Sequence, residues 1–176
     1  PARRISKVHA AGGRADGSGG WDQLEAALRK AGAVSLVVAW FGDDLRCGEC
    51  SVRPKVETGL KYTAPAVWSV GGVTRTGAAV VSQVNGRPAY GGTPSDASVT
   101  RAIQDLRARG MATIFYPFVM MDIAAGNGLP DPWGGAEQAA YPWRGRITGE
   151  AADVAAFFGS AAPGGGEWSY RRMVLH

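Results

Sequence analysis

Three aspartates follow the C-terminal ends of the two most apolar runs of the sequence. Asp43 and Asp44 follow residues 34–41 (VSLVVAWF), and Asp122 follows residues 112–121 (ATIFYPFVMM). Such runs are typical of strands buried on both faces of a parallel sheet, where neighbouring strands lie ~4.8 Å apart. Carboxylates at the ends of two adjacent strands can hydrolyse a glycosidic bond. We therefore take Asp122, Asp44 and Asp43 as candidate catalytic residues. The alternative is that they cap turns and bind backbone amides, and so stabilise loops.

Aromatic side chains accompany the same strand ends. Trp40 lies near the end of the first run, and Trp133, Tyr141 and Trp143 lie in a Gly- and Pro-rich stretch after the second. Flat apolar rings suit the C–H face of a pyranose, so these four residues are candidates for substrate binding. They can equally pin the long loop to the domain or pack against another subunit. Tyr116, in the middle of the second run, is expected in the core.

Cys47 and Cys50 form a CxxC pair. Structural zinc needs four ligands, and the only two histidines, His9 and His176, lie near the ends of the sequence. We expect a reduced pair or a local disulfide and no metal. A redox or metal-binding α/β domain is the alternative that this pair leaves open.

Other sites of known pattern are not recognisable. No Gly-rich stretch is followed by the Lys of a phosphate-binding loop, and the runs at 11–20 and 164–166 follow no expected strand. A Ser-His-Asp triad lacks a central histidine. No cofactor is therefore expected.

Composition narrows the class of protein. The 176 residues are 45% hydrophobic with a net charge of +4, which fits one packed domain. Lys and Arg are scattered rather than interleaved with aromatic residues, so nucleic-acid binding is not expected. No apolar run approaches the ~20 residues that cross a bilayer, and the charged start PARRISKVHA lacks the apolar core of a signal peptide. Both ends look cut, so we expect a piece of a longer protein.

A helix is expected between the two strands. Ser95 or Asp96 can cap it, and Gly110 ends it. Its buried face is expected to comprise Val99, Ala102, Ile103 and Leu106. The order strand, helix, strand predicts parallel pairing with a right-handed crossover.

The remaining elements are shorter. Residues 45–92 are expected to form an irregular insertion, with a short strand near 66–70 and a hairpin at 78–90 that turns on Asn85-Gly86. One further helix is predicted over 23–30, capped by Asp22. Another is predicted over 150–158, capped by Thr148, with Val154, Phe157 and Phe158 buried. Residues 168–176 begin an amphipathic segment.

Five strings can be read together: WFGDDLR (40–46), AYGGTPSD (89–96), FYPFVMMDI (115–123), NGLPDPWGGAEQAAYPWRGRIT (127–148) and EWSYRRMVLH (167–176). They resemble the TIM-barrel-like, glycoside-hydrolase-like domain in the large tail-tip protein of gene transfer agents and related tailed phages. The resemblance implies an α/β fold, a partial (β/α)₈ barrel with long loop insertions, of which residues 1–176 are the N-terminal part. A later strand of that family carries a Glu suited to a catalytic acid, and no corresponding segment exists here.

The same resemblance implies a setting and two functions. The expected setting is the tail of a phage-like particle assembled in the bacterial cytoplasm. The expected partners are other tail-tip subunits, including further copies of the chain, and a cell-surface or cell-wall glycan. The domain is then either a structural or receptor-facing part of the tail tip, or an active glycosidase that uses Asp122 and Asp44. Fold alone does not decide between them.

Overall fold

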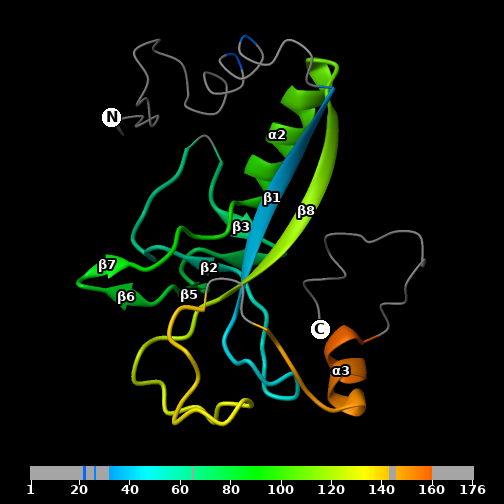
Figure 1. Ribbon diagram of the computed structural model, residues 1–176. Coiled ribbons are helices and arrows are strands. Elements are labelled where there is room, and N and C mark those ends of the chain that lie inside the picture. The colour runs from blue at the N-terminus through cyan, green and yellow to red at the C-terminus, as the bar shows by residue number, and fades with distance from the viewer. Residues whose placement is uncertain (1–21, 23–25, 27–31, 65, 143–145, 160–176) are drawn as a thin grey trace.

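The computed structural model describes residues 22, 26, 32–64, 66–142 and 146–159 (Figure 1). Two long strands and the helix between them form its upper part, and short strands and loops lie below and to one side. The elements are β1 (Ala33–Gly42), β2 (Lys55–Val56), β3 (Ser69–Val70), β4 (Val73–Thr74), β5 (Ala79–Val80), β6 (Gln83–Val84), β7 (Arg87–Pro88), α2 (Asp96–Ala108), β8 (Ala112–Met121) and α3 (Ala151–Phe158).

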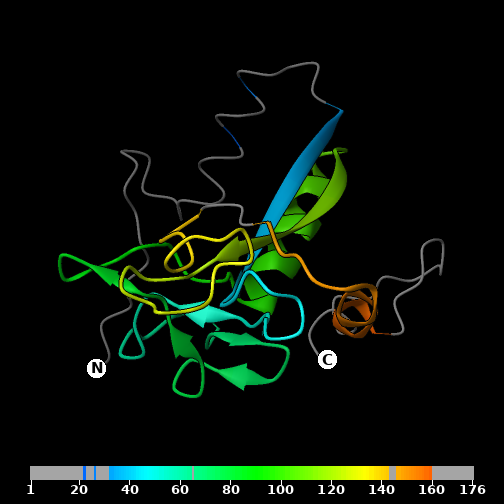
Figure 2. The same cartoon turned by 60° about the horizontal axis from the view of Figure 1, so that its bottom comes forward.

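The long strands β1 and β8 pair in parallel, as predicted. Their register runs without interruption from Ala33 opposite Ala112 to Gly42 opposite Met121. Pro117 interrupts neither strand, because an edge strand accommodates a residue that lacks an N–H. Helix α2 connects the two strands and lies along one face of the pair (Figures 1 and 2).

The boundaries of α2 follow the predicted signals. The Ser95 side chain accepts a hydrogen bond from the Ser98 backbone N–H at 3.2 Å, which satisfies one of the free donors of the first turn. Gly110 has a φ of 72°, a left-handed conformation that ends a helix at little cost. Val99 and Leu106 are buried, as predicted, whereas Ala102 and Ile103 of the predicted inner face are half-buried.

The main core lies between the sheet and α2. Its buried members are Val38, Trp40, Val56, Trp68, Val70 and Val99, with Leu36, Ile103 and Phe115 packed against them. The opposite face of the sheet is open among the described residues, since Val37, Ile114 and Tyr116 are exposed. Burial on both faces was therefore wrong for these strands, and Tyr116, half of whose surface is exposed (50%), does not lie in the core.

The segment between β1 and α2 is irregular, as predicted, but it supplies part of the core. Val56, Trp68 and Val70 belong to the main cluster, and the Trp68 indole donates to the Thr93 carbonyl at 2.8 Å. The expected hairpin is present in shortened form as β6 and β7. Its turn residues Asn85 and Gly86 have φ values of 51° and 72°, as a type I′ turn requires. The strand near 66–70 is reduced to β3, which pairs with β4.

Helix α3 forms where predicted, but not in the predicted way. Glu150 precedes it without a capping side-chain hydrogen bond. Thr148 instead bridges to Arg46, with its backbone bonded to Leu45 and Cys47. The predicted Thr148 cap was wrong, because the Thr148 backbone is hydrogen-bonded to the loop after β1 and Glu150 is the residue that precedes the helix. No side chain of α3 is fully buried, so the burial predicted for Val154, Phe157 and Phe158 was also wrong.

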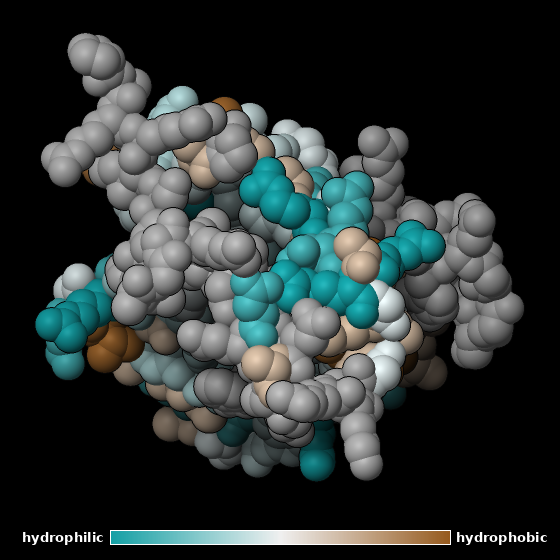
Figure 3. Space-filling model, turned by 90° about the horizontal axis from the view of Figure 1, so that it is seen from above, coloured by the Kyte–Doolittle hydropathy of each residue, from teal (hydrophilic) through white to brown (hydrophobic). Residues whose placement is uncertain are grey.

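Four two-stranded sheets account for the strands of the described residues, and none of them closes into a barrel. The helix expected over 23–30 lies largely outside the described residues. In the view from above, hydrophilic residues predominate on the described surface around the upper end of α2, β1 and β8 (Figure 3). None of the described helices is both long and apolar enough to cross a membrane.

Candidate functional site

The carboxyl ends of β1 and β8 bring the three predicted aspartates to one end of the sheet. The strands finish level, with Gly42 opposite Met121, and the Asp122 N–H donates to the Gly42 carbonyl at 2.8 Å. The loops that follow, 43–50 and 123–142, lie together below the sheet (Figure 1). The geometry that places Asp43, Asp44 and Asp122 here is the one expected for parallel neighbours.

Asp122 forms a buried ion pair. Its Oδ2 lies 2.8 Å from Nζ of Lys55, and the two side chains are 0% and 11% exposed. Both oxygens also accept from the Ser82 backbone N–H, at 3.2 and 3.1 Å. The carboxylate therefore joins three segments, at the ends of β8, β2 and β5, and its charge is balanced by one lysine.

Tyr90 packs beside this ion pair. Its hydroxyl donates to the Met121 carbonyl at 3.1 Å, and its ring lies 5.9 Å from Phe41 and 6.1 Å from Tyr141, centroid to centroid. Burial, together with the nearby charge of Asp122 and the neighbouring Tyr141, raises the pKa of the Tyr90 hydroxyl. The hydroxyl is thus held protonated as a hydrogen-bond donor.

Asp44 is held by a different cation. Arg46 binds it with Nε at 3.0 Å and Nη2 at 2.7 Å, and the Arg46 backbone N–H adds a third bond at 2.8 Å. Gln138 Nε2 donates to the same carboxylate at 2.8 Å. Burial acts to raise the pKa of Asp44, but the hydrogen bonds from Arg46 and Gln138 outweigh it and lower the pKa below its usual value.

Gln138 connects the two loops. Only 1% of its surface is exposed, and it accepts from the Leu45 N–H at 2.8 Å while donating to Asp44 and to the Pro130 carbonyl. Every polar atom of the amide is therefore engaged. Through these bonds Gln138 links the long loop after β8 to the loop after β1.

Asp43 is the most accessible of the three. It accepts from the Ser51 N–H at 2.7 Å and forms an ion pair with Arg53 at 2.9 Å, with side chains 32% and 50% exposed. Thus each of the three carboxylates binds its own cation and at least one backbone N–H. This matches the alternative reading of the sequence, in which the aspartates stabilise loops.

The four candidate aromatic residues are not gathered into one platform. Trp40 is 8% exposed and belongs to the main core cluster, so its ring is not available to a ligand. Tyr141 is half-buried against Tyr90 and has a φ of 48°. Trp143 lies outside the described residues. Trp133 is 50% exposed and is the candidate that the described structure presents to solvent.

Carboxylates within the long loop hold the backbone around Trp133. Asp131 accepts from the N–H groups of Trp133 at 3.2 Å and Gly135 at 2.9 Å. Glu137 accepts from those of Gly126 at 3.0 Å and Gly128 at 2.9 Å. The exposed indole is thus carried by a loop with a defined conformation, which lowers the entropy lost when it binds a partner.

The cysteines form no disulfide. Both thiols are free, and burial raises the pKa of each, with the charge of Asp153 adding to the effect on Cys47. Within the described ranges, no group of three or more His, Cys, Asp or Glu side chains is placed to hold a metal ion. These thiols lack the lowered pKa of a reactive cysteine.

Lys55 and Gln138 are the important residues that the sequence did not reveal. Lys55 lies 67 positions from its partner, and Gln138 is a single amide in a loop. Neither residue stands in a recognisable motif. The one available signal was indirect: a buried carboxylate requires a cation from elsewhere in the chain.

Comparison with known proteins does not assign the chain to a family. No family model matches the sequence, and a search of curated proteins found no match.

Proposed function

We propose that the chain is a glycoside-hydrolase-like domain of the large tail-tip protein of a phage-like particle, in which it has a structural, host-facing role. The resemblance of the strings around Asp44, residues 89–96 and Asp122 supports the setting. The buried ion pair between Lys55 and Asp122 supports the structural role, and it is the observation on which this choice depends.

The ion pair argues against Asp122 as a glycosidase residue. An acid or nucleophile must touch the glycosidic oxygen or the anomeric carbon, whereas the side chain of Asp122 is fully buried. Its oxygens are occupied by Lys55 and the Ser82 amide. Removing the carboxylate from Lys55 would leave an unpaired buried ammonium, which is costly. The same carboxylate is well suited to fixing loops.

In this proposal the loop that carries Trp133 makes the contact with the host glycan. An exposed indole on a braced loop fits stacking on a neutral sugar ring of a cell-wall or cell-surface glycan. The described part of this loop, 123–142, contains Asp131 and Glu137 and no Lys or Arg, so it offers no charge for an anionic polymer. The remaining partners in this proposal are other tail-tip subunits, including copies of the chain within the particle.

Binding to purified host cell-wall material tests this function. Trp133→Ala should weaken co-sedimentation by about fivefold, since one stacked ring contributes on the order of 1 kcal/mol by analogy with aromatic pairs. Tyr62→Ala is the matched control, because Tyr62 is an aromatic residue with 85% exposure on a loop distant from Trp133 in sequence. Equal binding by both variants would contradict the role of the Trp133 loop.

A further inference from the structure

The loop between β2 and β3 presents three large apolar side chains to solvent. Leu60 is 97% exposed, Tyr62 is 85% exposed and Val67 is 69% exposed. In Figure 1 the loop projects away from the small sheets, on the side of the molecule opposite α3. Single exposed apolar residues are common on protein surfaces, whereas several on one protruding loop indicate a contact surface.

Ionic contacts fix the base of this loop. Glu57 binds Lys61 at 2.5 Å and Arg75 at 3.3 Å. The Arg75 guanidinium also donates to the Thr58 carbonyl at 2.9 Å and lies 5.4 Å from the centroid of the Trp68 ring. Since Trp68 belongs to the main core, Arg75 anchors the loop to that core. The exposed side chains are therefore held by an anchored loop, which lowers the entropy lost when they bind a partner.

The charge around the loop is positive. Residues 58–95 contain Lys61, Arg75 and Arg87 and no Asp or Glu. The carboxylate that precedes this range, Glu57, is neutralised by two of these cations. A surface that is both apolar and positive is complementary to a partner that carries anionic groups over an apolar layer.

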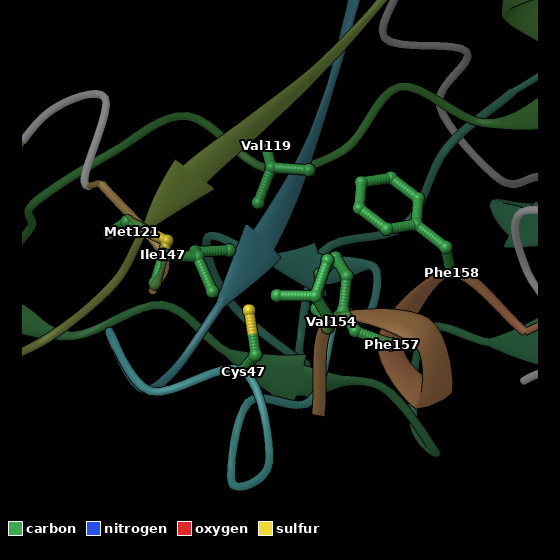
Figure 4. Close-up of a pocket in the computed structure, with 7 residues that line it drawn as sticks. All are labelled: Cys47, Val119, Met121, Ile147, Val154, Phe157 and Phe158. Carbon is green, nitrogen blue, oxygen red and sulfur yellow. The ribbon is translucent and has the colours of Figure 1, made fainter. Parts of the chain in front are cut away.

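A second apolar surface has a different shape. Val119 of β8 and Val154, Phe157 and Phe158 of α3 line a pocket of about 300 Å³ (Figure 4). The labelled side chains face one another across this pocket, so a flat surface cannot reach them. The loop of Leu60 protrudes instead, and it can enter a partner that has no groove of its own.

We propose that the loop 57–68 inserts Leu60 and Tyr62 into the surface of an anionic phospholipid bilayer. The leucine reaches the boundary between headgroups and acyl chains, and the tyrosine ring lies among the headgroups with its hydroxyl in water. The cations of residues 58–95 attract the lipid phosphates. A soluble polyanion such as a nucleic acid would use these cations but leave Leu60 in water, so the bilayer fits both features. This contact goes beyond the proposed glycan contact of Trp133 and does not depend on it.

Co-sedimentation of the 176-residue chain with vesicles tests the proposal. Vesicles of equimolar phosphatidylcholine and phosphatidylglycerol should bind the chain at least about tenfold more tightly than vesicles of phosphatidylcholine alone, and added salt should weaken this binding. Leu60→Ser should weaken binding to the anionic vesicles about tenfold, because the apolar side chain is lost. Ile114→Ser is the matched control, since Ile114 is a 57% exposed isomer of leucine on the open face of the sheet, and it should leave binding unchanged. Equal binding to both kinds of vesicle, no binding to the anionic vesicles, or equal binding by Leu60→Ser and the unmodified chain would overturn the proposal.

A fluorescent probe locates the contact. Leu60→Cys and Ile114→Cys are each labelled with an environment-sensitive dye in a Cys47→Ala, Cys50→Ala background. When anionic vesicles are added, emission from position 60 should shift to shorter wavelength because the dye enters an apolar layer, and emission from position 114 should not shift. No shift at position 60 overturns the proposal. Sedimentation equilibrium without vesicles tests the other occupant: a dimer that Leu60→Ser converts to a monomer would also overturn it, since a second copy of the chain would then cover the loop.

Discussion

The substitution Asp122→Asn should destabilise the domain strongly. Asn keeps the shape of Asp122 but removes the charge that balances Lys55, whose side chain is 11% exposed. One oxygen also becomes an NH₂ group, which cannot accept from the Ser82 N–H as Asp122 now does at 3.1 Å. The variant therefore leaves a buried cation without its counter-charge and a backbone donor with fewer acceptors.

The magnitude follows from the burial of the pair. Removing one partner of a buried ion pair costs about 3–5 kcal/mol. The Ser82 N–H keeps the remaining side-chain oxygen as an acceptor, so its contribution to the loss is small. We expect a loss of about 3–5 kcal/mol in the free energy of unfolding. For a domain of total stability near 5–15 kcal/mol this is a large fraction.

The assay is urea unfolding followed by tryptophan fluorescence, with a double-mutant cycle. Lys55→Met alone should also be costly, whereas Lys55→Met with Asp122→Leu should cost much less than the two single changes together. Asp43→Asn is the matched control. Its pair with Arg53 is solvent-exposed, so its loss should cost no more than about 1 kcal/mol.

One result would refute this reasoning. If Asp122→Asn costs no more than Asp43→Asn, Lys55 does not depend on Asp122, and the ion pair is not what holds the strand ends together. A carboxylate that can be neutralised without loss would again be a candidate for catalysis.

Three further predictions concern pH, the thiols and the helix cap. The pKa of Asp44 is lowered in the folded state, so its contribution to stability is present above the unfolded-state pKa of 3.8 and is lost as the pH falls through the folded-state pKa. Urea midpoints should therefore decline below about pH 4, and they should decline less in Asp44→Asn. Burial raises the pKa of both the buried Cys47 and the half-buried Cys50, so they should react with a thiol reagent at pH 7 at least about tenfold more slowly in the folded chain than in urea. Elemental analysis should find no stoichiometric metal; rapid labelling or one zinc per chain would contradict this. Ser95→Ala should cost about 1 kcal/mol by urea unfolding, because the Ser98 N–H loses its acceptor; an unchanged midpoint would show that the cap does not matter.

The long elements could be predicted because their signals are local. The apolar runs gave β1 and β8, Ser95 and Gly110 bounded α2, and Asn85-Gly86 gave the hairpin turn. In each case the residues that determine the conformation lie within a few positions of one another.

The candidate site could be predicted only in part, since its contacts are long-range. The predicted strand ends indicated where Asp44 and Asp122 lie. The hydrogen bonds and ion pair that hold these carboxylates come from Lys55 and Gln138, which are distant in sequence. Trp40 illustrates the same limit: its type suits a sugar platform, while its place in the core is set by packing against Val56 and Trp68. Which side of a strand faces the core follows from tertiary packing rather than from residue type.

Hydrolysis of host cell-wall material tests the central claim most directly. The measurement is the release of reducing sugar by the longest protein that contains this domain, beside its Asp122→Asn variant, at a temperature where both remain folded. A structural, ion-paired Asp122 predicts no release by either protein. Release by the unmodified protein that disappears in Asp122→Asn would contradict the account, since it would make this carboxylate catalytic.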